Sequence, residues 1–305
     1  MARETAELTG TVLGTTGGVY EVETEGGLLV EASLRGRLKQ EQRTGDRVVA
    51  GDRVEILRQE DGSYTIETVR PRAAELVRCA PGRGAKRAKV IVANVDQVVV
   101  VFAAAHPPPN TRMLDRFLVL IESNQIPALI VVNKIELVAE SELESTFSPY
   151  PDAGYEVLRT SVKTGAGIDQ LRDRLKDRES VLTGPSGVGK SSLLNTLQPG
   201  LDLRIGEVSG TVDKGRHTTV SARLIRLHFG GWVADTPGLR ELGLWEVDTE
   251  RLQDYFPEFR ARSHECRFAS RCTHTHEPAC AVRLAVDAGS LSPARYQSYL
   301  AMRGE

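Results

Sequence analysis

The sequence is poor in the features that mark several special classes of protein. Its 305 residues include only four cysteines and carry a formal net charge of −2. Four cysteines are too few for a disulfide scaffold of this length. A net charge this small excludes a uniformly basic nucleic-acid-binding protein, so any contact with nucleic acid must come from a local patch.

Long apolar runs are also lacking. The N-terminal segment MARETAELTG has no apolar core of signal-peptide length, and no stretch reaches the roughly 18 apolar residues that a membrane helix needs. We therefore expect a cytoplasmic protein that does not contact a membrane. The length and the 40% apolar content are typical of a globular chain with two or three domains.

Residues 1–72 consist of short apolar stretches separated by turn signals such as GTTGG and EGG. Strands this short and this regularly interrupted predict a small all-β domain. An OB-like barrel is our preferred form, although other small barrels share the pattern. A basic segment, residues 73–90, follows. Between positions 70 and 89 there are seven arginines or lysines and one acid, Glu75, so this segment is either a solvated linker or a contact for RNA phosphates.

The pattern changes over residues 91–245. Strand-like runs such as DQVVVVFAA and ALIVVNK alternate there with amphipathic stretches such as TRMLDRFLVLIESN. This alternation predicts an α/β domain with a mainly parallel sheet that is covered on both faces. Residues 246–305 are predicted to form short helical pieces around a Cys/His cluster. This region is too small to build a large core by itself, and a bound metal would supply the missing stability.

The segment ESVLTGPSGVGKSSLLNTL matches the pattern of a phosphate-binding P-loop between a strand and a helix. In this pattern the glycines let successive backbone N–H groups point at phosphates, and the helix N-terminus adds partial positive charge. Lys190 would neutralise β and γ oxygens, and Ser191 can bind Mg²⁺. The predicted phosphate-binding residues are Gly184, Pro185, Ser186, Gly187, Val188, Gly189, Lys190, Ser191 and Ser192.

Two segments after the P-loop are predicted to sense the γ-phosphate. In WVADTPG, Asp235 ends a strand and would hold Mg²⁺ through water, and the Gly238 N–H would approach the γ-phosphate. In GTVDKGRHTTV, Thr218 and Thr219 are candidates for the threonine that reaches Mg²⁺ and the γ-phosphate. The predicted Mg²⁺ ligands are Ser191, Thr219 and Asp235.

The segments that resemble guanine-recognition motifs precede the P-loop instead of following it. VVNKIEL and TSVKTGAG each end a predicted strand, and the base-contacting residues that we expect in them are Asn133, Lys134, Glu136, Ser161, Val162 and Lys163. Along the chain, the two base segments therefore come first, the P-loop follows, and the two switch segments come last. A circular permutation of a GTPase domain explains this order with one assumption. In that order the chain passes directly from the last switch into the C-terminal region, so movement of the switch is covalently linked to that region.

The segment HECRFASRCTHTHEPACAV carries a predicted zinc site. The ligands that we expect are Cys266, Cys272, His274 and Cys280. Three thiolates and one imidazole make a closed tetrahedral set of the structural kind, because no position is left for a substrate. His276 is our second choice for the histidine ligand, and His264 is also near enough to compete. The alternative is that the cysteines are reduced and pack as small apolar residues.

The motif order, together with GPSGVGKSS, GRHTT, DTPG and the Cys/His cluster, resembles the RsgA (YjeQ) family of circularly permuted GTPases that depend on the small ribosomal subunit. The resemblance covers nearly the whole chain and implies an OB domain, a permuted GTPase domain and a zinc domain. It implies GTP or GDP, Mg²⁺ and one Zn²⁺ per chain as ligands. It also implies a factor, which we expect to be a monomer, that acts late in maturation of the small (30S) subunit and binds its rRNA through the OB and zinc domains. This chain has Glu136 where the family usually has Asp, and Val162 where Ala is common.

Leu239 follows DTPG, at the position where many GTPases carry the glutamine that orients the attacking water. Because leucine cannot hydrogen-bond to water, we expect slow intrinsic hydrolysis of GTP that the small subunit stimulates. His217 is a candidate to position the water, or else it is an exposed histidine of a loop. The alternative function is a nucleotide-regulated RNA-binding module without significant GTP turnover. A P-loop kinase would leave NKIE and the other two domains unexplained.

Overall fold

The computed structural model describes residues 7–38, 47–79, 88–201, 222–235 and 249–304. The chain divides into two compact units. The first comprises Met1–Val98, Asp173–Leu182 and Glu207–Arg240, and the second comprises Val99–Arg172, Thr183–Gly206 and Glu241–Glu305. Among the described residues, no helix combines the length and the apolar character that crossing a membrane requires.

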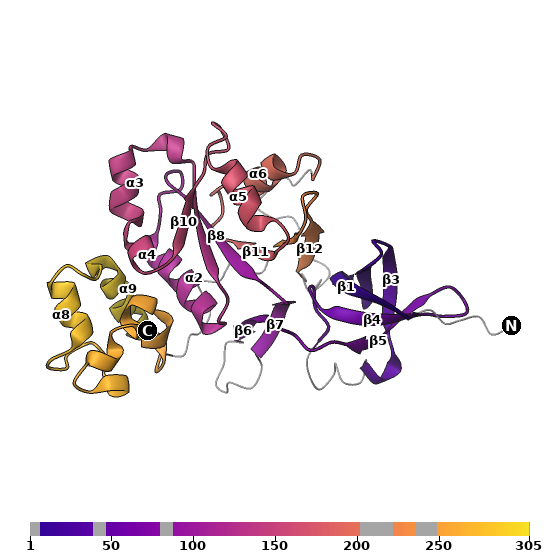
Figure 1. The fold of residues 1–305 in the computed structure, drawn as a ribbon, viewed down its shortest axis with the longest axis horizontal. Helices are drawn as coiled ribbons and strands as arrows, with labels where there is room; N and C mark the ends of the chain where they lie inside the picture. The colour runs from indigo at the N-terminus through magenta and orange to yellow at the C-terminus, as the bar shows by residue number, and fades with distance from the viewer. Residues whose placement is uncertain (1–6, 39–46, 80–87, 202–221, 236–248, 305) are drawn as a thin grey trace, which may run out of the picture. The chain divides into compact units, whose positions relative to one another are not determined.

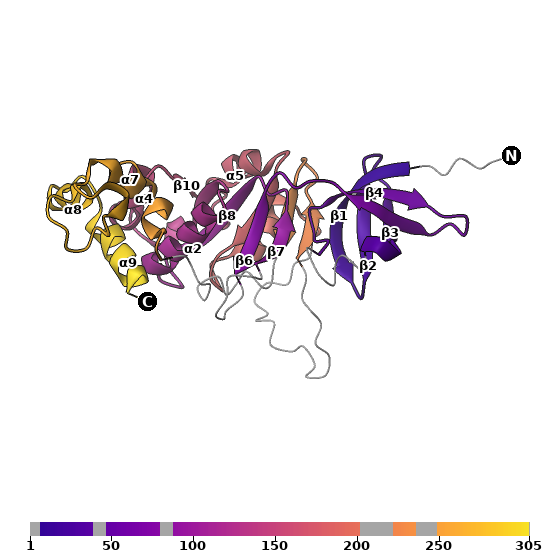
Figure 2. The ribbon, with the colours of Figure 1, turned by 90° about the horizontal axis from the view of Figure 1, so that it is seen from below.

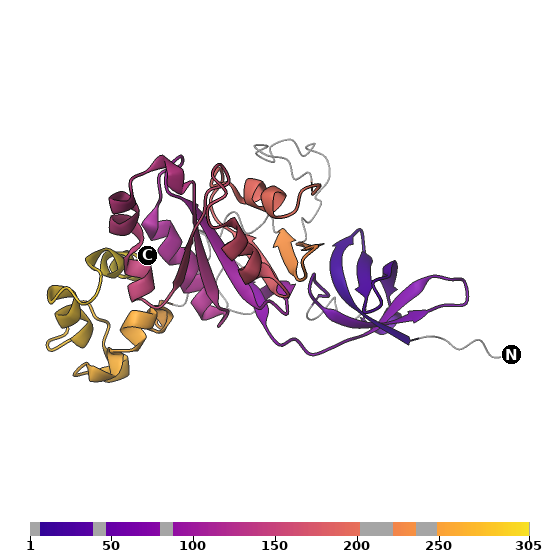
Figure 3. The same cartoon turned by 45° about the horizontal axis from the view of Figure 1, so that its top comes forward.

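The N-terminal strands close into a barrel, drawn at the indigo end of the chain in Figures 1 and 3. The strands are β1 (Glu7–Thr16), β2 (Val19–Thr24), β3 (Leu29–Leu34), β4 (Arg53–Arg58) and β5 (Tyr64–Val69), in the order β1, β2, β3, β5, β4. Neighbours are antiparallel except for β3 and β5, which run parallel. Buried apolar residues, among them Val54, Ile56 and Ile66, fill the interior. This five-stranded closed barrel confirms the predicted β domain.

The central sheet has six strands in the order β10, β9, β8, β11, β13, β12. Their bounds are β8 (Gln97–Ala103), β9 (Ala128–Asn133), β10 (Glu156–Arg159), β11 (Glu179–Thr183), β12 (Arg223–Arg226) and β13 (Trp232–Asp235). β10 is parallel to β9 and β11 is parallel to β13, whereas β12 is antiparallel to β13. β11 pairs with β8, although β9 and β10 lie between them along the chain. The strand that leads into the P-loop thus occupies an interior place in the sheet, as the permutation requires.

Helices connect the strands where the amphipathic pattern predicts them. They are α2 (Thr111–Ser123), α3 (Glu140–Phe147), α4 (Pro149–Asp152), α5 (Ile168–Leu175) and α6 (Lys190–Leu197), together with the 3-10 turn η1 (Ile135–Leu137). α2 begins at Thr111 because Asn110 caps it, accepting a hydrogen bond from the Met113 N–H at 3.0 Å. Its inner side packs on β8, where the rings of Phe117 and Phe102 meet edge to face with centroids 6.1 Å apart.

The segment predicted as a basic linker is partly regular. β6 (Glu75–Cys79) and β7 (Ala88–Ala93) pair as a separate two-stranded antiparallel sheet (Figure 2). Arg72, one of the seven basic residues between positions 70 and 89, lies directly before this segment and donates hydrogen bonds to the buried Asp52 carboxylate at 2.7 and 3.0 Å. One residue of the basic patch is therefore paired inside the protein. The predicted domain boundaries after residues 72, 90 and 245 stay predictions.

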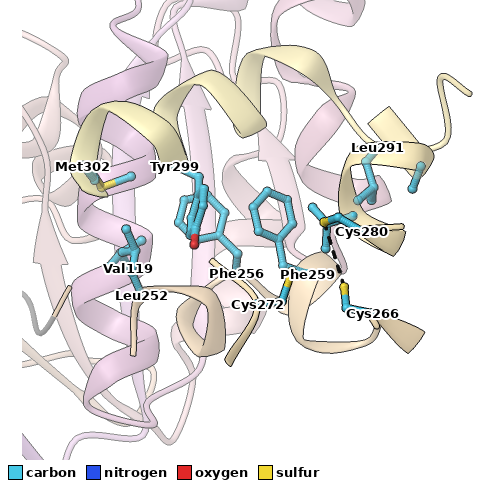
Figure 4. Close-up of a cluster of buried hydrophobic side chains, with 12 residues drawn as sticks. Val119, Leu252, Phe256, Phe259, Cys266, Cys272, Cys280, Leu291, Tyr299 and Met302 are labelled. Atoms are coloured by element: carbon cyan, nitrogen blue, oxygen red, sulfur yellow. Dashed lines mark hydrogen bonds between the residues drawn. The ribbon is translucent and has the colours of Figure 1, made fainter. Parts of the chain in front are cut away.

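Residues 249–304 form a small helical body that we call the C-terminal module. Its elements are η3 (Leu252–Tyr255), α7 (Pro257–Arg260), η4 (Ser263–Glu265), η5 (Ala269–Arg271), α8 (Ala281–Asp287) and α9 (Pro293–Arg303). Its core is aromatic: the rings of Phe256 and Phe259 stack at 5.0 Å, and Tyr299 meets both rings edge to face. Val119 of α2 belongs to the same cluster (Figure 4). A residue outside the module therefore completes its core.

Candidate guanine-nucleotide site and metal centre

The P-loop joins β11 to α6 through backbone conformations that favour glycine. Gly184 has a φ of 132° and Gly189 has a φ of 99°. A Cβ at Gly184 would lie 2.1 Å from the Val101 carbonyl oxygen, and a Cβ at Gly189 would lie 2.4 Å from Nδ2 of Asn133. The loop therefore passes too close to β8 and to the NKIE segment for a side chain at either position.

Lys190 begins α6 and folds its side chain back over the loop. Its Nζ donates hydrogen bonds to the carbonyl oxygens of Gly184 and Pro185, each at 2.6 Å. Ser191 and Ser192 follow in the first turn of α6. An ammonium group and the N–H groups at a helix start therefore lie at the same loop, and both attract phosphate oxygens.

Two side chains of the NKIE segment fasten it to the P-loop. Asn133 is 2% exposed, and its Nδ2 donates to the Val188 carbonyl oxygen at 3.0 Å. Lys134 adopts a left-handed backbone with φ of 63°, and its Nζ donates to the Gly187 carbonyl oxygen at 2.7 Å. The partners in these bonds are 55 and 53 residues apart along the chain. The fold thus brings together the two motifs whose order in the sequence is inverted.

The second base segment lies beside the first. The Thr160 Oγ1 donates to Oδ1 of Asn133 at 3.2 Å, so Asn133 is held from both sides. Ser161 is buried, Val162 is half-buried and Lys163 is exposed. Thr160 was not among the predicted residues, although it stands directly before them in TSVKTGAG.

A further contact comes from the segment HPPPN, which the sequence indicates only as a loop before a helix. The His106 carbonyl oxygen accepts a hydrogen bond from Nζ of Lys134. The Ala104 N–H donates to the Asn133 carbonyl oxygen at 2.8 Å. Segment 104–110 is therefore part of the candidate site. A backbone carbonyl leaves no residue-type signal, so sequence reasoning could not find this contact.

Several predicted residues lie outside the described ranges, namely His217, Thr218, Thr219, Gly238 and Leu239. Of Asp235 the structure describes the backbone, which ends β13 and pairs in register with Leu182 of β11. This register sets Asp235 beside the strand that leads into the P-loop. Glu136 lies in η1 with its side chain exposed. The roles assigned to these residues stay predictions.

Four predicted metal ligands come together in the C-terminal module. Their ligand atoms all lie within 4.8 Å of one another and all four side chains are buried: Cys266, Cys272, His274 and Cys280. The Sγ atoms of Cys266 and Cys280 are 3.9 Å apart, and Nδ1 of His274 is 3.3 Å from the Cys280 Sγ. Two thiolates bound to one zinc at about 2.3 Å would be about 3.8 Å apart in a tetrahedron, so the cluster fits a zinc ion. His276, the second choice, is exposed.

Burial disfavours ionisation of these thiols unless a cation binds to them. It raises the pKa of Cys272 to about 12 and also raises the pKa of Cys280. Burial lowers the pKa of His274, which keeps the imidazole neutral and able to act as a ligand. A divalent cation would displace the thiol protons and neutralise the charge of the thiolates. Three sulfurs and one neutral imidazole are a donor set that zinc prefers.

Hydrogen bonds hold the loop that carries His274. The Glu277 carboxylate accepts from the Thr273 N–H at 2.7 Å and from the Thr275 N–H at 3.0 Å. Although burial acts to raise the pKa of Glu277, hydrogen bonds from Thr273 lower it to about 2. The Tyr299 hydroxyl donates to the Thr273 carbonyl oxygen at 2.8 Å. These groups orient the ligand loop, and the cysteine spacing had not pointed to either of them.

The sequence is similar to a known family over most of its length. A family model described as RsgA GTPase matches residues 69–245. The small ribosomal subunit biogenesis GTPase RsgA of Gemmatimonas aurantiaca is 52% identical over 99% of this chain and 98% of its own length. The protein of the same name from Moorella thermoacetica is 46% identical over 97% of this chain and 96% of its own length.

The fold is similar to two solved structures. The crystal structure of YjeQ from Thermotoga maritima matches with a TM-score of 0.80 at 36% identity, covering 98% of each chain. The structure of YloQ, a circularly permuted GTPase, matches with a TM-score of 0.76 at 30% identity, covering 100% of this chain and 96% of that one. These likenesses confirm the predicted barrel, the permuted GTPase domain and the C-terminal Cys/His module. The chain therefore belongs to the RsgA GTPase family and is a GTP-hydrolysing enzyme.

Proposed function

We propose that this GTPase acts late in maturation of the small (30S) ribosomal subunit. It binds the subunit and its rRNA, hydrolyses GTP slowly when alone, and hydrolyses it faster on the subunit. Curated relatives carry this biogenesis role in their names at up to 52% identity. The observation on this chain that supports the proposal is the fastening of Asn133 and Lys134 to the P-loop, because it brings the segment proposed to select the base against the loop proposed to bind phosphate. GTP favours binding to the immature subunit, and hydrolysis favours release.

The phosphate half of the site would neutralise and align the triphosphate. The backbone N–H groups of residues 184–192 and Nζ of Lys190 bind the β and γ oxygens. Ser191, Thr219 and Asp235 are the residues that would hold Mg²⁺, and Thr218 is the neighbouring candidate. When bound, Mg²⁺ neutralises charge on the phosphates.

Hydrolysis forms a bond between a water oxygen and the γ phosphorus and breaks the bond from that phosphorus to the β–γ bridging oxygen. His217 would position the water, since Leu239 cannot hydrogen-bond to it. Gly238 would contribute its N–H to the γ-phosphate. Contact of the ribosomal subunit with these residues would then accelerate turnover.

The base half of the site would select guanine. The Glu136 carboxylate accepts hydrogen bonds from the N1–H and the exocyclic amine of guanine. Adenine carries an acceptor at N1, so ATP would leave the carboxylate unsatisfied. Lys134 belongs to the same base segment, and the segment of Ser161, Val162 and Lys163 would close the base site through backbone N–H groups. We therefore expect a clear preference for GTP over ATP.

The Cys/His cluster would hold one structural Zn²⁺ per chain, bound by Cys266, Cys272, His274 and Cys280. The support is the closed, buried set of four donors with spacings that suit a tetrahedron. Bound zinc supplies folding free energy that a module this small cannot draw from its core alone.

One edge of the C-terminal module suits single-stranded rRNA. Phe268, between two ligand cysteines, is 45% exposed, and the Arg267 guanidinium lies 5.8 Å from its ring centroid. Residues 260–272 contain four arginines and a single acid, Glu265. Exposed aromatic rings stack on unpaired bases, and arginines pair with phosphates. We therefore assign this edge, which includes the exposed Arg271, to rRNA contact.

Steady-state GTP hydrolysis tests this function. The purified protein is assayed alone and with purified small ribosomal subunits, with ATP as the control nucleotide. Strong stimulation confined to GTP supports the proposal, whereas equal use of ATP refutes the base assignment and lack of stimulation refutes the role of the subunit. The alternative, an RNA-binding module without significant turnover, predicts nucleotide-dependent rRNA binding and no phosphate release. We expect the factor to work as a monomer in the cytoplasm.

A further inference from the structure

A buried ion cluster joins the C-terminal module to helix α2. Arg295 of α9 is 2% exposed, and its Nη1 donates to Oδ1 of Asp115, in α2, at 2.7 Å. Its Nε and Nη2 donate to the two carboxylate oxygens of Glu258, in α7, at 2.8 and 3.1 Å. Glu258 lies within the module, whereas Asp115 lies on a helix of the GTPase domain. Arg295 thus has two bonds inside the module and one bond to α2.

Stability alone does not account for a charged cluster at this position. Desolvation offsets much of the attraction between buried charges, and apolar side chains of similar volume often stabilise a protein as well. Aromatic rings already surround the guanidinium, since Cζ of Arg295 lies 4.7 Å from the ring centroid of Phe256, 5.5 Å from that of Tyr150 and 5.7 Å from that of Tyr155. Unlike apolar side chains, the charged groups form hydrogen bonds that depend on orientation. The planar guanidinium must face Asp115, which gives α9 one register on α2.

The N-terminal end of α2 reaches the nucleotide site. Segment 104–110 leads into α2, and within it the His106 carbonyl oxygen accepts a hydrogen bond from Nζ of Lys134. In the same segment, Cδ of Pro107 is 3.6 Å from the place where a Cβ on Gly187 would be. A side chain expected to bind guanine therefore bonds to the segment that leads into α2, and the loop expected to bind phosphate passes close to that segment.

We propose that α2 couples the nucleotide site to the C-terminal module, with Arg295 and Asp115 as the joint. A shift of Lys134 or of the P-loop on nucleotide binding moves segment 104–110 and with it α2. The directional bond of Arg295 passes this movement to α9 instead of letting the two helices slide past each other. This route is separate from the covalent link, expected from the permuted order, between the last switch and the C-terminal region. It requires nucleotide binding but not the ribosomal subunit.

Hydrogen exchange of the full-length, zinc-loaded protein tests the joint. Exchange of the α9 amides is compared with a nonhydrolysable GTP analogue and with GDP. Asp115→Leu removes the partner on α2 and leaves the bidentate pair of Arg295 and Glu258 intact. Asp115→Ala, which also removes the acceptor, is a smaller second variant in case the first does not fold. Glu122→Gln is the matched control, because it removes an exposed ion pair, 3.2 Å long, between Glu122 of α2 and Arg260 of α7.

In the wild-type protein and in the control, we expect α9 exchange to differ between the two nucleotides by on the order of fivefold. In Asp115→Leu we expect this difference to vanish, with zinc content and affinity for the GTP analogue unchanged. The proposal is overturned by equal exchange with both nucleotides in the wild-type protein. It is also overturned if the difference persists undiminished in a folded Asp115→Leu or Asp115→Ala protein. Failure of the ribosomal role would appear elsewhere, as a lack of subunit-stimulated hydrolysis.

Discussion

Replacing Gly189 by alanine is expected to break the contact between the P-loop and the NKIE segment. The new Cβ would lie 2.4 Å from Nδ2 of Asn133. Asn133 would then have to leave its hydrogen bonds to Val188, at 3.0 Å, and to Thr160, at 3.2 Å. The φ of 99° adds backbone strain for any residue with a side chain.

The expected loss of unfolding free energy is the sum of the backbone strain and the lost hydrogen bonds of Asn133. Backbone strain costs roughly 1–2 kcal/mol, and the two lost hydrogen bonds cost about 1 kcal/mol each. Gly189→Ala should therefore lower the free energy of unfolding by about 3–4 kcal/mol. Gly200→Ala is the matched control, because Gly200 has a φ of 93° and, among the described residues, no atom lies within 4 Å of its Cβ position. It should lose only the strain, about 1–2 kcal/mol.

Urea unfolding of the nucleotide-free proteins measures the difference, and titration with a GTP analogue measures affinity. The gap of about 2 kcal/mol between the two variants isolates the displacement of Asn133. We expect Gly189→Ala to weaken binding of the analogue by about tenfold or more. The displaced Asn133 would no longer link the NKIE segment to the P-loop. Equal losses of unfolding free energy in the two variants, with affinity unchanged in both, would refute the reasoning.

Three further changes test other parts of the molecule. His217→Ala should lower subunit-stimulated turnover and spare nucleotide affinity, and unchanged turnover would remove His217 from the mechanism. Phe268→Ala should weaken binding to single-stranded RNA about tenfold. Leu284→Ala, which truncates a side chain that is 60% exposed in the same module, should not, and equal effects would contradict stacking. Removing zinc with a chelator should abolish slow hydrogen exchange in α9 but not in the barrel strands; continued protection of α9 would argue against a metal there.

The local parts of the site were predictable from the sequence. The P-loop depends on glycines at fixed offsets between a strand and a helix, and a few adjacent residues carry that whole signal. The placement of the predicted base segments was predictable for the same reason, because each is a short run at a strand end. Their inverted order also pointed to the permutation, which explains why β11 pairs with β8.

The contacts between distant segments were not predictable. Asn133 and Val188 are 55 residues apart, and Arg295 and Asp115 are 180 residues apart, so no local pattern links them. The position of His274, rather than His276, beside the sulfurs depends on the backbone, because His274 has a φ of 57° and its ring lies among the sulfurs. The pairing of Arg72 with Asp52 likewise removes a charge that composition alone would assign to the surface.

The fastening of Lys134 and Asn133 to the P-loop has a consequence for the growing chain. Their partners Gly187 and Val188 are synthesised 53 and 55 residues later. A nascent chain that ends before β11 carries the base segment but lacks the P-loop partners of Asn133 and Lys134. Guanine nucleotide can therefore stabilise this domain only after α6 has left the exit tunnel, when most of the protein has been translated. In the ordinary motif order the phosphate loop comes first, so the permutation reverses the order in which the phosphate-binding and base-binding halves are synthesised.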